Sequence, residues 1–154
     1  MQLNIDSIDY SKTLGPSIGK TFKMIEDFMD NILAANEIFI SKKQWLVLNL
    51  IKSNNGINQN DLANFTNRDK TSITRFINNL EKKQFIERQC STEDKRVKIL
   101  FLTKKGEETL AKATPIIRQA IFEIQNEISD SEIENAIKSL NKIQEKINHL
   151  QKIK

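Results

Sequence analysis

Two hydrophobic periods follow one another in the middle of the chain. Apolar residues in the segment 69–82 recur at the spacing of one helix face, namely at Ile73, Phe76, Ile77 and Leu80. This spacing predicts a helix with one buried stripe. In residues 85–88 and 97–102 the period shortens to two, and β-branched and aromatic residues dominate. Two runs of strand length around a polar segment predict a β-hairpin.

A shorter helix is predicted just before this one. Asn58 is a suitable N-cap, and Ile57 and Leu62 have the spacing of a hydrophobic staple. We expect this helix to end near Phe65 and the next to begin at Asp69, whose carboxylate suits the positive end of a helix dipole. Two adjacent helices joined by a short turn are typical of a helix-turn-helix.

The outer face of the second helix carries no carboxylate. It is predicted to consist of cations, hydroxyls and amides, from Arg68, Thr71, Arg75, Asn78, Asn79 and Lys82, with Ser72 and Thr74 on its flanks. These groups pair with phosphate oxygens and base edges. We therefore interpret residues 69–82 as a DNA recognition helix, and the alternative is an ordinary solvated face.

The predicted hairpin has a charged tip, with Glu93, Asp94, Lys95 and Arg96 in succession. We expect Asp94 to contact Arg96 and so stiffen the tip, while Arg96 or Lys95 reaches into a narrow minor groove. The alternative interpretation is an ordinary charged turn.

Helices are also predicted on both sides of this region. One begins at Leu14 and has an apolar seam. A second opens with a capping box at Ser41 and Gln44 and carries Trp45, which we assign to packing rather than base stacking. Thr103 can cap a third helix, in which Pro115 predicts a kink or a break near residues 111–114.

The last predicted helix restarts at residues 129–131 and has a heptad-like seam of Ile133, Ala136, Leu140, Ile143, Ile147 and Leu150. A core of about 50 residues is too small to cover this seam together with those of the other flanking helices. Burial against a second copy of the chain is the simplest solution, since each fully buried large side chain contributes about 1.5 to 3 kcal/mol before entropy is counted. We therefore predict a homodimer.

The positive charge of the chain is concentrated in the same central region. Residues 59–105 hold 11 Lys or Arg against 6 Asp or Glu, whereas the rest of the 154 residues hold 13 against 14. A basic patch on a nearly neutral body favours DNA as the partner over a membrane surface. No apolar run of 18 residues and no secretory signal pattern occurs, so we expect a cytoplasmic location.

Other chemistry is sparse. A lone cysteine, Cys90, excludes an internal disulfide and a thiolate metal cluster, and is either an oxidant sensor or an inert exposed thiol. The single histidine, His149, has no partner in sequence. We therefore expect no metal, no cofactor and no enzymatic activity.

Several short motifs appear together in one order: Ser41-x-x-Gln44-Trp45-x-Val47-Leu48, Asp61-Leu62-Ala63, Asp69-Lys70-Thr71-Ser72-Ile73-Thr74-Arg75, Leu80-Glu81-Lys82-Lys83, Ile86-Glu87-Arg88, Asp94-Lys95-Arg96 and Leu102-Thr103-Lys104-Lys105-Gly106. In this order the sequence resembles the MarR family of winged-helix bacterial transcription regulators, closely over about residues 38–110. The resemblance implies a homodimer on a palindromic operator, with the second helix in the major groove and the wing at the minor groove.

Two positions depart from the family pattern. Gln84 stands where the family usually has glycine after the recognition helix, so it must either adopt a positive φ or end the helix differently. The wing has Asp94-Lys95-Arg96 where many members have Asp-Arg-Arg. Both departures leave the expected fold intact, but a sequence preference cannot be carried over.

The sequence thus predicts a mainly α protein with a small β-hairpin wing: an N-terminal arm and dimerisation helix (1–40), a winged helix-turn-helix core (41–103) and C-terminal dimerisation helices (104–154). We expect a regulator, in particular a ligand-responsive repressor, with the recognition helix at about 69–82 and the wing at about 89–97. The candidate DNA contacts are Arg68, Lys70, Thr71, Ser72, Thr74, Arg75, Asn78, Asn79, Lys95 and Arg96, with Asp94 stiffening the wing.

A small-molecule effector is a further candidate partner. For its pocket wall we name Phe22, Ile25, Phe39, Trp45 and Ile117. The competing hypothesis is a helical interaction protein that keeps the winged scaffold but docks onto another protein through its last helix, without binding an operator.

Overall fold

The computed structural model describes residues 9–66, 69–92 and 94–152. Its elements are a short 3₁₀ turn (Tyr10–Lys12), α1 (Leu14–Ala35), α2 (Lys42–Ser53), β1 (Ile57–Asn58), α3 (Gln59–Phe65), α4 (Lys70–Lys82), β2 (Ile86–Cys90), β3 (Lys98–Leu102), α5 (Lys104–Gln125) and α6 (Asp130–Lys152). The chain divides into two compact units, one ending at Ile117 and one beginning at Arg118. The predicted mainly α fold with a small β wing is confirmed.

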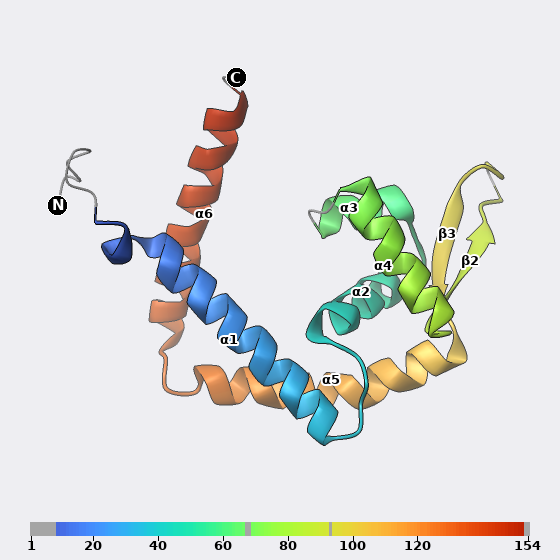
Figure 1. The fold of residues 1–154 in the computed structure, drawn as a ribbon, viewed down its shortest axis with the longest axis horizontal. Coiled ribbons are helices and arrows are strands. Elements are labelled where there is room, and N and C mark those ends of the chain that lie inside the picture. Colours follow the sequence, from blue (N-terminus) through green and yellow to red (C-terminus); the bar gives the residue numbers. More distant parts are fainter. Residues whose placement is uncertain (1–8, 67–68, 93, 153–154) are drawn as a thin grey trace. The chain divides into compact units, whose positions relative to one another are not determined.

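Buried apolar residues of α1 to α5 and of the three strands form the core of the first unit, in which α4 lies beside β2 (Figure 1). Ile73, Ile77 and Leu80 on α4 have no exposed surface, and Phe76 is only half-buried. They share the core with fully buried residues of five other elements, namely Leu48 and Ile51, Leu62, Ile86, Leu100 and Leu110. The predicted buried stripe of α4 therefore sets which side of the helix faces solvent.

The wing consists of β2, β3 and their connection, and it belongs to a three-stranded antiparallel sheet in the order β1-β3-β2. β2 pairs with β3 from Ile86 opposite Leu102 to Cys90 opposite Lys98. The third strand, β1, was not predicted, and it pairs Ile57 with Leu100. This pairing joins the start of α3 to the wing.

The predicted helix starts are confirmed by their caps. Asn58 accepts from the amide of Asp61 at 2.9 Å, and Asp69 accepts from those of Thr71 and Ser72 at 2.9 Å. A full capping box at Ser41 opens α2. Each cap satisfies amides that the first turn of a helix would otherwise leave unpaired.

Gln84 ends α4 with a positive φ of 61°, the first of the two outcomes expected for it. The backbone amide of Gln84 donates to the carbonyl of Glu81 at 2.8 Å. The backbone amide of Phe85 donates to the carbonyl of Leu80 at 3.0 Å. This is a Schellman motif, which normally places glycine at the left-handed position. Thr103 supports the turn by donating its hydroxyl to the carbonyl of Gln84 at 2.6 Å.

A kink or a break of α5 was expected near residues 111–114, and no break occurs. The helix runs from Lys104 to Gln125 with Pro115 inside it. Proline removes the bond to the carbonyl of Ala111, but both residues are exposed, so water can take the place of the missing donor. In the second unit α6 begins at a capping box, where Glu132 accepts from the amide of Ser129 at 3.0 Å.

Candidate nucleic-acid interface

The outer face of α4 is open to solvent. Lys70, Thr71, Arg75, Asn78, Asn79 and Lys82 are all exposed. Glu81, a carboxylate within the helix, points instead to Arg88 of β2, with Oε2 2.6 Å from Nη1. Asp69 is held at the cap, where the hydroxyl and amide of Ser72 hold the pKa of its carboxyl below the ordinary value. The predicted carboxylate-free face is confirmed over α4.

Three side chains on the N-terminal half of this face are unengaged. Within the described residues, Lys70, Thr71 and Arg75 make no polar side-chain contact with the rest of the protein. Their two cations and one hydroxyl are therefore available to an external partner. Arg68, also a candidate DNA contact, lies outside the described residues.

Two other candidate contacts on α4, Ser72 and Thr74, already have hydrogen-bond partners within the protein. Thr74 donates its hydroxyl to the carbonyl of Lys70 at 2.6 Å and accepts from Nε2 of Gln59 on α3 at 2.7 Å. The hydroxyl of Ser72 donates to Asp69 at 2.6 Å. Both hydroxyls therefore already use their single proton within the protein.

The two asparagines of α4 have partners that sequence reasoning missed. Oδ1 of Asn78 accepts from Nη2 of Arg88 at 2.6 Å, and Oδ1 of Asn79 accepts from Nε2 of Gln44 at 3.1 Å. Gln44 lies 35 positions from Asn79 in sequence, and Arg88 lies on a different element from Asn78. No local sequence pattern therefore identifies these partners. The capping box did single out Gln44, but only as a helix start.

The tip of the wing presents exposed cations. Lys95 is exposed, and the Arg96 side chain is 93% exposed although its Nε lies 3.4 Å from Oδ1 of Asp94. Asp94 also accepts from the backbone amide of Arg96 at 2.9 Å. The predicted contact between Asp94 and Arg96 is confirmed, and it holds the turn while the guanidinium stays accessible.

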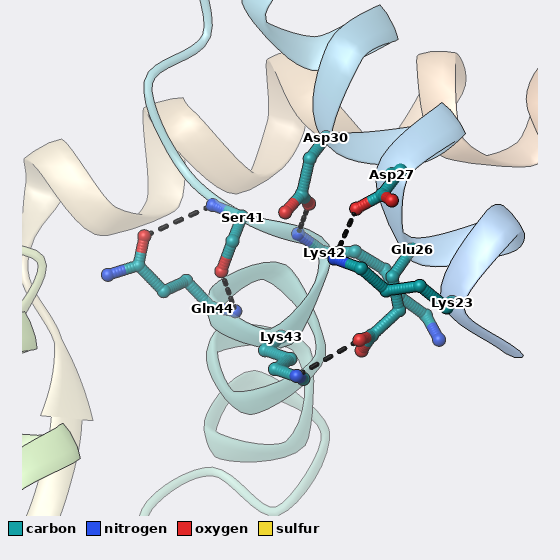
Figure 2. A network of polar contacts seen from close by, with 8 residues as sticks. All are labelled: Lys23, Glu26, Asp27, Asp30, Ser41, Lys42, Lys43 and Gln44. Atoms are coloured by element: carbon teal, nitrogen blue, oxygen red, sulfur yellow. Dashed lines mark hydrogen bonds and ion pairs between the residues drawn. The ribbon is translucent and has the colours of Figure 1, made fainter. Parts of the chain in front are cut away.

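A polar network anchors the start of α2 to α1 (Figure 2). The amide of Lys42 donates to Oδ1 of Asp30 at 2.6 Å, and Nζ of Lys43 lies 3.0 Å from Oε2 of Glu26, whose side chain is only 12% exposed. Carboxylates beside the first turn of a helix are favourable because they face the positive end of its dipole. The network therefore fixes the segment from which Gln44 reaches α4.

The five residues predicted to form one pocket wall lie in different environments, from fully buried to exposed. Phe22 lines a cavity of about 220 Å³ with Glu26, Lys42, Lys43, Leu46, Val47, Phe65 and Thr66, a set that contains none of the other four. Phe39 is 78% exposed and Ile117 fully buried, while Ile25 and Trp45 are half-buried. Trp45 donates its ring N–H to the hydroxyl of Thr114 at 3.1 Å, in agreement with a packing role.

These elements define a winged helix-turn-helix protein: α3 and α4 form the helix pair, and β2 and β3 form the wing. The family model of the MarR family matches residues 40–98 of this chain, a segment that contains α2, the helix pair and the start of the wing's second strand. None of the described helices is long and apolar enough to cross a bilayer.

Solved structures share the fold over nearly the whole chain. AbsC, a MarR-family transcriptional regulator from Streptomyces coelicolor, is 16% identical with a TM-score of 0.80, covering 93% of this chain and 97% of its own. The MepR–DNA complex from S. aureus is 23% identical with a TM-score of 0.78, covering 88% and 98%. A mutant E. coli MarR complexed with operator DNA is 22% identical with a TM-score of 0.72, covering 88% and 99%.

Proposed function

We propose that this protein is a dimeric, sequence-specific transcriptional regulator that places α4 in the major groove of an operator and its wing at the adjacent minor groove. A regulator of the chromosome would act in the cytoplasm and needs no catalytic centre. The observation that carries the proposal is the outer face of α4, where Lys70, Thr71 and Arg75 are exposed and unengaged and no carboxylate opposes a phosphate.

The wing supports the same assignment. Lys95 and Arg96 stand exposed at its tip, and the Asp94 contact limits the conformations that the tip can adopt. A cation on a stiff turn suits the narrow, strongly negative minor groove. MepR and MarR, which share the fold, have been seen bound to DNA.

Exposed apolar seams support the homodimer. On α6 Ile137, Leu140, Ile147 and Leu150 are between 38% and 52% exposed, and on α1 Leu14, Ile18 and Phe22 are between 41% and 58% exposed. A second copy would cover such seams, and a two-fold dimer places two α4 helices about one turn of duplex, roughly 34 Å, apart. We therefore infer that the operator is palindromic.

Repression that responds to a ligand is the finer part of the proposal. The cavity beside Phe22, Leu46 and Phe65 has apolar walls, and two lysines, Lys42 and Lys43, stand at it. Glu26, also in the lining, is paired with Lys43, which leaves Lys42 to face an anionic group on an otherwise apolar molecule. Because Lys42 and Lys43 also anchor α2 to α1, a bound molecule would act on the segment that carries Gln44.

Selection of DNA from a random library by the purified protein tests the proposal. We expect a palindromic consensus, and we expect Leu140→Lys with Ile147→Lys to shift the molar mass in light scattering from dimer to monomer and to abolish selection. Failure of the wild-type protein to enrich any sequence at 50 mM salt would refute operator binding.

A further inference from the structure

The orientation of the Asn79 side-chain amide is fixed by a chain of two hydrogen bonds that starts at the backbone amide of Ser41. The amide of Ser41 can only donate, and it donates to Oε1 of Gln44 at 3.1 Å. The opposite end of the Gln44 amide is therefore the NH₂ group. This group can only donate to Asn79, so Asn79 must turn its carbonyl oxygen inward, 3.1 Å away.

The same orientation occurs on the other flank of the helix. The Arg88 guanidinium has no acceptor, so at 2.6 Å from Asn78 it requires the carbonyl oxygen of that asparagine. Both asparagines thus direct their oxygens to the protein. Within the described residues neither Nδ2 has a protein partner, and both side chains are exposed. The helix therefore offers only N–H donors at these two positions.

This orientation limits which bases the asparagines can read. The common pairing of asparagine with adenine uses the amide as donor to N7 and as acceptor from N6 at once. Because the side-chain oxygen of Asn79 faces the protein, it cannot accept from N6 of adenine. In the major groove cytosine presents only a donor, thymine presents one acceptor, O4, and guanine presents two adjacent acceptors, O6 and N7, so guanine matches the NH₂ group of a donor-only amide best.

We propose that Asn79 donates to guanine in each half-site and that Gln44 is the positioning residue that sets this preference by holding the amide of Asn79. This inference rests on the proposed DNA-binding function. Gln44 itself is 9% exposed and belongs to the α2 capping box, so it acts through Asn79 rather than by touching DNA.

A single substitution, Gln44→Glu, tests the idea. Glutamate also closes a capping box, so the bond from Ser41 is kept. A carboxylate cannot donate, however, and Asn79 is expected to rotate its amide, donate to the new carboxylate and present its oxygen to the groove. The matched control is Gln59→Glu, which adds the same charge on α3 beside Thr74 and does not touch Asn79.

The measurement is selection from a random DNA library at constant salt, with circular dichroism to verify folding. We expect wild type to prefer guanine at one position per half-site, Gln44→Glu to reduce that preference by roughly fivefold or more at that position, and Asn79→Ala to relax it. Gln59→Glu should weaken binding without changing the base preferred there.

Two results would overturn the proposal. One is a folded Gln44→Glu variant that selects the wild-type consensus unchanged. The other is an Asn79→Ala variant that lowers affinity for all sequences alike, since a contact to phosphate would do so. If Gln44→Glu does not fold, Asn79→Ala decides alone. Absence of any DNA selection by wild type would instead be a failure of the proposed function itself.

Discussion

Arg88 on β2 forms an ion pair with Glu81 in the last turn of α4, with Nη1 and Oε2 2.6 Å apart. The same guanidinium donates through Nη2 to Asn78 at 2.6 Å. One side chain of the wing therefore holds two residues of the helix that we propose reads DNA. The pair is neither fully buried nor fully exposed, with side-chain exposures of 26% and 38%.

Loss of this side chain should lower stability moderately. We expect Arg88→Ala to reduce the free energy of unfolding by about 1 to 2 kcal/mol, because two hydrogen bonds to a charged donor are removed at a half-buried site. Urea denaturation measures the difference. The control is Lys138→Ala, which breaks an ion pair with Glu134 whose side chains are 67% and 69% exposed, and it should change stability by less than about 0.5 kcal/mol. Equal effects of the two variants would contradict this ranking.

The cap of α4 should make stability depend on pH in acid. Hydrogen bonds from Ser72 and Thr71 hold the pKa of Asp69 below its ordinary value. The ionised cap therefore stabilises the folded protein above the unfolded-state pKa of about 3.9, and this contribution is lost as pH falls below that value.

Unfolding measured between pH 6 and pH 3 tests the cap. The stability difference between wild type and Asp69→Asn should shrink across the acidic end of this range. In a Ser72→Ala background the pH-dependent part should be smaller, because Ser72 is the main cause of the lowered pKa. A difference that stays constant down to pH 3 would show that Asp69 does not act as an ionised cap.

Gly106 should not tolerate a side chain. A Cβ at this position would overlap the carbonyl oxygen of Phe85, which is backbone and cannot move away easily. We expect Gly106→Ala to destabilise the protein by about 1 to 3 kcal/mol in thermal or urea unfolding. Gly19→Ala in α1 is the matched control, since nothing lies within 4 Å of its added Cβ. That variant should gain up to about 1 kcal/mol, and a similar loss in both variants would refute the steric account.

Gln84 offers the opposite case, in which glycine should help. Its φ of 61° strains a residue with a Cβ, so Gln84→Gly should stabilise the protein by about 1 kcal/mol. Lys83→Gly is the neighbouring control at a φ of −76°, where glycine only adds freedom to the unfolded chain and should destabilise. Stabilisation by both substitutions, or by neither, would contradict this explanation.

Sequence reasoning succeeded where the signal is local. The starts of α2, α3 and α4 follow from side chains two or three residues away from the amides that they cap, as at Asn58 and Asp69. The outward direction of Arg75 follows from the apolar period of a single helix. Both signals lie within one turn or one helix, so they can be read without knowing the fold.

What could not be predicted depends on contacts between distant segments. β1 has only two residues, Ile57 and Asn58, too few to show a period, and it exists because Ile57 pairs with Leu100. Periodicity places Asn79 on the outer face, but not the 3.1 Å bond from Gln44 that turns its oxygen inward. Those partners meet only after the chain has folded.

The central claim is that the exposed face of α4 binds duplex DNA, and fluorescence anisotropy across 50 to 200 mM salt measures it most directly. The duplex selected by wild type should bind more weakly as salt rises, with a slope in log–log form of about −0.9 for each phosphate contact. Arg75→Ala and Arg96→Ala should each lower affinity by at least about fivefold, while Lys138→Ala on α6 should not. Binding that is insensitive to salt, with both arginine variants equal to wild type, would contradict the account.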